Sequence, residues 1–267
     1  MLRQRILTAL ALLVIALLAL FAAPPLLWQG LIVLVAAMAA WEWTQFARMR
    51  KAPARIGFVT LTVVCLMAGL WFELYQALIW FALAQLILTV VTVTRFQTTQ
   101  GGAIWQSSWL NLLVGLLFIV SFGLALVWLR DEVSVWLLLL SLSMIWLVDT
   151  GAYFSGRRFG RHKLAVHVSP GKTWEGVAGG VLLAWVVALA VWFVAEINYQ
   201  PGLVAFVLGL SLIAGLSVFG DLFESLMKRQ VGLKDSGKIL PGHGGVLDRI
   251  DSLLLALPLY WIFWSFA

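Results

Sequence analysis

Residues 202–222 read GLVAFVLGLSLIAGLSVFGDL, an apolar run of 21 residues whose one charged side chain, Asp221, stands at its end. A helix needs about 20 mostly apolar residues to cross the hydrocarbon core of a bilayer. The length excludes a spanning strand, which would have about ten residues of alternating polarity. The run therefore predicts a transmembrane helix that ends with a carboxylate near one membrane surface.

Similar apolar runs occur along the whole chain. The nine predicted spans are residues 6–22, 27–47, 56–72, 75–93, 105–129, 133–154, 177–195, 202–222 and 247–266. Composition agrees, since 63% of residues are hydrophobic, 11% are charged, and the mean hydropathy is +1.00. So few charges cannot cover a water-soluble protein. We predict an all-α, polytopic transmembrane bundle that forms one domain over residues 1–267, with N-terminal spans to about residue 130 and a site on about 133–267.

The first run also resembles a signal peptide, because two arginines precede it and Ala22-Ala23-Pro24 follows it. An uncleaved first span is favoured, since the next span follows directly after the Pro24-Pro25 turn.

Basic residues indicate the orientation of the spans. If nine spans alternate in direction, 17 of the 18 lysines and arginines fall on one side and Arg130 falls on the other. The positive-inside rule makes the basic side cytoplasmic and places the N-terminus there. Two long segments, residues 155–176 and 223–246, lie on that side, and long loops are often functional. We expect a bacterial inner membrane, because the chain is compact and carries no targeting extension.

Acidic residues gather at the same predicted surface. Eight of the 12 follow position 148, and all of these except Glu196 are predicted to lie at that surface, namely Asp149, Glu175, Asp221, Glu224, Asp235, Asp248 and Asp251. Ionisable groups at the edge of hydrocarbon tend to face a polar cavity or one another. A shared site is the simplest explanation.

Residues 220–229 are expected to continue the eighth span as a helix. Its polar residues Asp221, Glu224, Ser225 and Lys228 follow i, i+3, i+4, i+7 spacing and therefore share one face. This face is either part of a site or an ordinary solvated stripe with helix ion pairs.

Residues 240–252 read LPGHGGVLDRIDS. Glycines around His243 allow a ligand to approach the backbone, and free amide groups at a helix start attract an anion. Asp248 and Asp251 point the same way in the first helical turn. Carboxylates there also stabilise the helix dipole. That alternative does not account for the neighbouring His243 and Arg249.

Residues 169–176, SPGKTWEG, contain the Gly-Lys-Thr of phosphate-binding loops. The full motif needs a glycine where this chain has Val166, and a preceding strand, so we exclude it. We expect instead that Ser169 caps a helix, so that Lys172 and Thr173 reach a phosphate. Asp149 is equally well explained as a helix cap or as a site residue.

Other features have structural interpretations. Gly176 and Gly180, four residues apart, predict close helix packing. Glu42 stands between two tryptophans, which suits the membrane interface. His162 and His167 lack metal-ligand spacing and are expected to be exposed to solvent.

Residues 225–251 resemble the signature of the phosphatidate cytidylyltransferases, also called CDP-diacylglycerol synthases. The match comprises SLMKR at 225–229, Lys234-Asp235 and LPGHGGVLDRID at 240–251. Residues 149–153 and 169–176 also look like the family's, although Gly171 stands where a second basic residue is expected. The resemblance covers the C-terminal half, and the first spans match only in kind.

The resemblance implies transfer of a cytidylyl group from CTP to phosphatidic acid, which gives CDP-diacylglycerol and pyrophosphate, with Mg²⁺ at the inner face of the membrane. The implied metal ligands are Asp221, Asp248 and Asp251. Carboxylates together with substrate phosphates suit Mg²⁺. The expected catalytic residues are Lys228, Asp248 and His243. The expected substrate-binding residues are Lys172, Thr173, Ser225, Arg229, Lys234, Gly244, Gly245 and Arg249.

Two other classes of protein, a transporter and a membrane scaffold, explain the sequence less well than this enzyme does. A transporter for an anionic solute would place ionisable groups near the bilayer midplane, whereas here they gather at one face. A membrane scaffold leaves the glycine-histidine segment unexplained. The expected partners are both substrates and the lipid bilayer, and a homodimer is left open. Nucleic acid is not expected, because the 15 tryptophans fit membrane anchoring better than base stacking.

Overall fold

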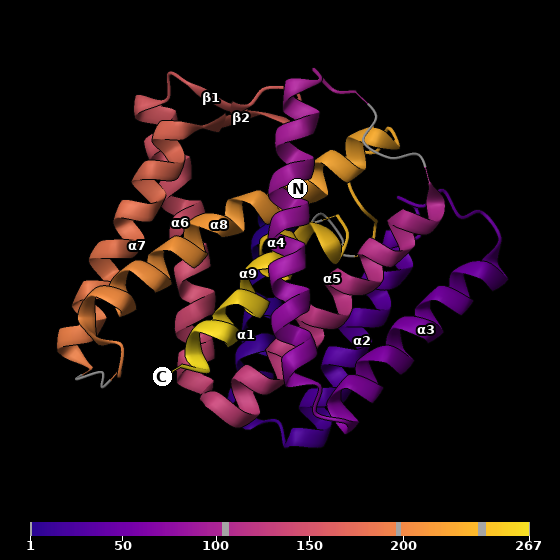
Figure 1. The fold of residues 1–267 in the computed structure, drawn as a ribbon, viewed down its shortest axis with the longest axis horizontal. Helices are drawn as coiled ribbons and strands as arrows, with labels where there is room; N and C mark the ends of the chain where they lie inside the picture. The colour runs from indigo at the N-terminus through magenta and orange to yellow at the C-terminus, as the bar shows by residue number, and fades with distance from the viewer. Residues whose placement is uncertain (1, 103–106, 196–198, 240–243, 267) are drawn as a thin grey trace.

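The computed structural model describes residues 2–102, 107–195, 199–239 and 244–266. Nine long helices make up most of this described chain (Figure 1). They are α1 (Leu2–Ala22), α2 (Pro25–Trp43), α3 (Ala52–Trp71), α4 (Tyr75–Thr98), α5 (Ser108–Trp128), α6 (Val135–Phe159), α7 (Trp174–Val194), α8 (Gly202–Gln230) and α9 (Leu247–Trp264). A short π-helical turn, Leu129–Val133, joins α5 to α6.

Seven of these helices, α2 to α8, are long and apolar enough to cross a membrane. Helix α1 contains a shorter apolar stretch, Leu13–Ala22, and α9 begins with a charged turn. The all-α fold of an integral membrane protein is therefore confirmed. Whether all nine helices span the bilayer, with a cytoplasmic N-terminus, stays a prediction.

Helix α9 forms the centre of the bundle. It packs against α2, α4, α5, α6 and α8 and is buried along most of its length. Figure 1 shows it in yellow, with α6 and α7 on one side and α2 and α3 on the other. The outer helices α3 and α7 leave most of their side chains accessible, as lipid-facing helices must. The first turn of α9 thus carries Asp248 into the protein, whereas Arg249 in the same turn is exposed.

The segment between α6 and α7 differs from expectation. Helix α6 continues to Phe159, and an antiparallel hairpin follows, formed by β1 (Lys163–Ala165) and β2 (Ser169–Thr173). The prediction that Ser169 caps a helix is wrong, because Ser169 pairs with Ala165 in the hairpin. Thr173 caps α7 instead, and its Oγ1 accepts a hydrogen bond from the Gly176 amide at 3.1 Å. The pairing of β1 with β2 keeps the backbone extended up to Thr173, and α7 begins at the next residue.

Glycines set how closely two pairs of helices approach, α6 with α7 and α8 with α9. A Cβ on Gly176 would lie 2.8 Å from the Ala152 carbonyl oxygen, and one on Gly180 would overlap the backbone of α6. The predicted close packing of this glycine pair is confirmed. A Cβ on Gly220 of α8 would similarly lie 2.7 Å from the carbonyl oxygen of Asp251 on α9. These contacts bring the polar ends of α6, α7, α8 and α9 together.

Candidate active site

One group of polar side chains lies where the hairpin meets α8. Lys172 Nζ on β2 lies 2.6 Å from Asp221 Oδ2, and the Ser225 hydroxyl donates to Asp221 Oδ1 at 3.2 Å. Asp149 on α6 interacts electrostatically with both Lys172 and Asp221. We call Asp149, Lys172, Asp221 and Ser225 the hairpin cluster. Asp149 therefore lies with the predicted site residues, and it is not a helix cap, because α6 continues to Phe159.

A cavity of about 460 Å³ adjoins the hairpin cluster. Its polar lining includes Asp149, Arg157, Ser169, Lys172, Thr173 and Asp221. Carboxylates and cations from α6, β2 and α8 therefore line one cavity of a size suited to a small ligand. Arg157 supplies a basic side chain that the sequence did not single out.

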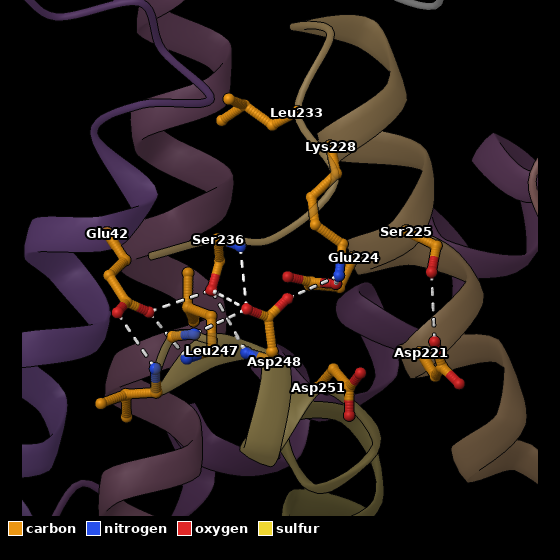
Figure 2. A network of polar contacts seen from close by, with 12 residues as sticks. Glu42, Asp221, Glu224, Ser225, Lys228, Leu233, Ser236, Leu247, Asp248 and Asp251 are labelled. Atoms are coloured by element: carbon orange, nitrogen blue, oxygen red, sulfur yellow. Dashed lines mark hydrogen bonds and ion pairs between the residues drawn. The ribbon is translucent and has the colours of Figure 1, made fainter. Parts of the chain in front are cut away.

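A second group lies at the start of α9. Lys228 of α8 is buried and forms ion pairs with Glu224 and with Asp248, whose Oδ1 lies 2.7 Å from Nζ. Asp248 Oδ2 accepts hydrogen bonds from the amides of Ser236 and Gly245, at 2.9 and 2.8 Å. We call Glu224, Lys228, Ser236 and Asp248 the loop cluster (Figure 2). The polar stripe on α8 is confirmed, and it is largely buried rather than solvated.

Asp251 connects the two clusters. It interacts electrostatically with Asp221 and Lys172 of the hairpin cluster and with Lys228 of the loop cluster. Figure 2 shows it between Asp248 and Asp221. One of its oxygens accepts a hydrogen bond from the Ser252 amide at 2.7 Å. The three predicted metal ligands therefore occupy one neighbourhood.

Within the described ranges, however, no three His, Cys, Asp or Glu side chains are already arranged as a metal site. Asp221 and Asp248 each form an ion pair with a different lysine, which holds the two carboxylates in separate clusters. The donor set nevertheless suits a hard divalent cation, because carboxylate oxygens outnumber lysines here. The metal assignment stays a prediction.

The remaining predicted residues lie at the edge of these clusters. Arg229, Lys234 and Arg249 are exposed, and Arg229 Nη1 donates to the Leu233 carbonyl at 3.5 Å. Their contact with substrate stays a prediction. His243 lies outside the described residues.

The two predicted substrate-binding glycines shape the turn before α9. Gly244 has a φ of +84°, which favours glycine, and a Cβ there would lie 2.8 Å from Asp248 Oδ2. Gly245 is buried and uses its amide to bind Asp248. Both glycines thus let the chain pass close to Asp248, and their contact with substrate stays a prediction.

The sequence interpretation of Glu42 is wrong. Its side chain is 1% exposed and lies inside the protein at the start of α9, so it does not face the membrane interface. Its carboxylate accepts hydrogen bonds from the amides of Val246 and Leu247, at 3.0 and 2.9 Å. A lone acid in an apolar span was the available signal, because such groups are costly unless they are paired. The flanking tryptophans favoured the interface instead.

The expected exposure of the hairpin histidines is confirmed. His162 is exposed, and its Nδ1 lies 2.5 Å from Glu175 Oε1 at the base of the hairpin. His167 is exposed as well.

Comparison with known proteins identifies the family. A model of the cytidylyltransferase family matches residues 3–267. The chain belongs to this family. A phosphatidate cytidylyltransferase of Pseudomonas aeruginosa is 40% identical over 263 residues, which cover 97% of this chain and 96% of the relative. One of Haemophilus influenzae is 36% identical over 295 residues, covering 100% and 99%, and one of Staphylococcus aureus is 36% identical over 216 residues, covering 78% of each chain.

Membership of the cytidylyltransferase family decides between the classes of protein considered above. The chain is a nucleotidyltransferase, and the transporter and scaffold alternatives fall away. The family match also includes the first spans, which the motif-based resemblance matched only in kind. The two clusters and the adjoining cavity therefore form the candidate active site of a membrane-bound cytidylyltransferase.

Proposed function

We propose that this cytidylyltransferase transfers a cytidylyl group from CTP to phosphatidate, giving CDP-diacylglycerol and pyrophosphate. The observation that carries the proposal is the adjacency of two lysine–carboxylate clusters, joined by Asp251, at the ends of transmembrane helices. Lysines beside carboxylates suit phosphates that arrive with a cation. The names of the full-length relatives support this choice of substrates.

The acidic residues are proposed to hold Mg²⁺. Five carboxyl groups surround two lysines, namely Asp149, Asp221, Glu224, Asp248 and Asp251 around Lys172 and Lys228. This excess of carboxylates supports a divalent cation held by Asp221, Asp248 and Asp251. When bound, Mg²⁺ would neutralise charge on the nucleotide phosphates and orient them.

The lysines are proposed to bind the reacting phosphates. Lys172 contacts Asp221 and the Val218 carbonyl, and Lys228 contacts Glu224 and Asp248, so each ammonium group has one further N–H to offer a phosphate oxygen. The lipid phosphate is an anion near neutral pH, so its oxygen attacks the α-phosphate of CTP without a strong general base. The new P–O bond forms as the bond to pyrophosphate breaks. Thr173 lines the cavity and Ser225 donates to Asp221, so both would contact the bound substrates, and the exposed Arg229, Lys234 and Arg249 would hold phosphates.

The roles of the segment before α9 follow from its position. Gly244 and Gly245 would let phosphate oxygens approach the backbone. His243 would donate a hydrogen bond to pyrophosphate or position the glycine turn.

The site is proposed to face the cytoplasm from a bacterial inner membrane. Residues 157–172 and 228–249 carry ten of the 18 basic residues, which supports that orientation. Nine spans with a cytoplasmic N-terminus account for the same distribution.

Incubation of the purified protein in detergent with labelled CTP, phosphatidate and Mg²⁺ tests the reaction. We expect a labelled lipid and release of pyrophosphate, and no labelled lipid when diacylglycerol replaces phosphatidate. Excess EDTA should abolish the signal, and added Mg²⁺ should restore it. Absence of labelled lipid from folded protein would refute the proposed reaction, and full turnover in EDTA would refute the role of the metal.

A further inference from the structure

The side chain of Glu42 bonds to the segment that carries Asp248, although the two lie far apart in the sequence. It accepts hydrogen bonds from the Val246 and Leu247 amides at the start of α9, and its Oε2 lies 3.1 Å from the Ser236 hydroxyl (Figure 2). A buried carboxylate is costly unless hydrogen-bonded, and these donors with the positive end of α9 provide that compensation. Glu42 therefore connects α2 to the start of α9 through hydrogen bonds.

Ser236 extends this contact to Asp248. Its amide donates to Asp248 Oδ2 at 2.9 Å, and its hydroxyl oxygen lies 2.9 Å from the same atom. The hydroxyl has one proton, so it donates to Glu42 or to Asp248 at a given moment. It also accepts a bond from the Asp248 amide at 3.3 Å. A single serine thus separates the carboxylate of Glu42 from that of Asp248.

Two other residues, just after the end of α2, hold the same segment. Gln45 Nε2 donates to the Ser236 carbonyl at 2.8 Å, and Arg48 Nη2 donates to the Gln230 carbonyl at 3.1 Å. These bonds fix the chain where it leaves α8 and again at Ser236. The end of α2 and the turn after it therefore support the segment between α8 and α9.

We propose that Glu42 is a positioning residue for the transfer reaction. It fixes the first turn of α9 and Ser236, so that Asp248 faces Lys228 in the geometry that the reaction needs. This inference rests on the proposed function for its effect on turnover. The alternative is a helix cap that matters only for stability. Loss of a positioning residue should lower turnover per folded molecule and raise hydrogen exchange at the Val246 and Leu247 amides. Loss of a cap that matters only for stability should lower the amount of folded protein and leave its turnover unchanged.

The variant Glu42→Gln separates these alternatives, with Glu73→Gln as a matched control. Glu73 is exposed in the turn between α3 and α4. The introduced carboxamide keeps one acceptor oxygen but directs its N–H groups at one of the two amide donors, so backbone hydrogen exchange at residues 244–250 should rise while exchange in α5 stays unchanged. We expect kcat per folded molecule to fall roughly 10- to 100-fold, and the KM for CTP to change less. Glu42→Asp, which keeps the charge, should retain more turnover than Glu42→Gln.

Wild-type kcat and unchanged exchange in folded Glu42→Gln would overturn the proposal. So would a loss of folded protein with normal kcat in the remainder. Should Glu42→Gln fail to fold, Ser236→Ala decides, because it removes the bridging hydroxyl and leaves the carboxylate in place. Normal kcat in Ser236→Ala would then overturn the link to Asp248. The exchange measurement uses no substrate, so it stands apart from failure of the wild type to form CDP-diacylglycerol.

Discussion

At the scale of single residues, two of the predicted metal-binding aspartates are each matched to a lysine from another element. Asp221 of α8 pairs with Lys172 of β2, and Asp248 of α9 pairs with Lys228 of α8. Loss of one member of such a partly buried pair leaves the other charge uncompensated. The pairs therefore hold the two carboxylates in a fixed orientation before substrate arrives.

Replacement of Asp248 by Asn tests this arrangement. The amide keeps the size of the side chain but loses its charge, and its N–H groups oppose either the Lys228 ammonium group or the amides of Ser236 and Gly245. We expect turnover to fall about 100-fold or more, in protein that still inserts and elutes as the wild type does. Asp131→Asn, in the π-helical turn before α6, should keep normal turnover in the same assay. Wild-type rates for Asp248→Asn would remove this residue from the site.

At the scale of elements, helix contacts through glycine determine which side chains meet. Gly176 and Gly180 on α7 bring that helix against the backbone of α6, and Gly220 does the same for α8 and α9. In a membrane, such small residues allow the close packing that stabilises helix pairs. The same contacts bring Lys172 towards Asp149 and Asp221 towards Asp251.

A pair of glycine variants measures the importance of this packing. A Cβ at Gly180 would overlap the Val148 carbonyl oxygen, whereas a Cβ at Gly57 on α3 meets nothing within 4 Å. Overpacking costs about 1–3 kcal/mol, so Gly180→Ala should lower the thermal midpoint in detergent. Gly57→Ala should leave it unchanged or raise it, since alanine favours the helix. Equal thermal midpoints for the two variants would mean that α6 and α7 can move apart at little cost in stability.

At the scale of the whole molecule, the two lysine–carboxylate clusters lie at one end of a largely apolar bundle. The hairpin, the end of α8 and the start of α9 form that end, and α9 is otherwise enclosed by apolar neighbours. This asymmetry suits an enzyme that joins a soluble nucleotide to a lipid, because each substrate reaches the site from its own phase.

Labelling with a membrane-impermeant maleimide tests the proposed orientation. In a variant with Cys65 replaced by alanine, single cysteines are introduced at the exposed positions Lys238 and Glu73. With a cytoplasmic site, Lys238→Cys should react in inside-out vesicles and be protected in spheroplasts. Glu73→Cys should show the opposite pattern. A reversed result would place the site on the external face.

The sequence by itself determined the helical runs, the clustering of acids and the polar face of α8, because apolar length and i, i+4 spacing are local properties of the chain. Tertiary structure alone decided the burial of Glu42 against α9, the pairing of Lys172 with Asp221 and the division of the aspartates between two clusters. Each of these contacts joins residues from different elements, and helix packing determines which distant side chains meet. The hairpin at residues 163–173 belongs with them, since its short strands lack the length and alternation that mark a strand in sequence.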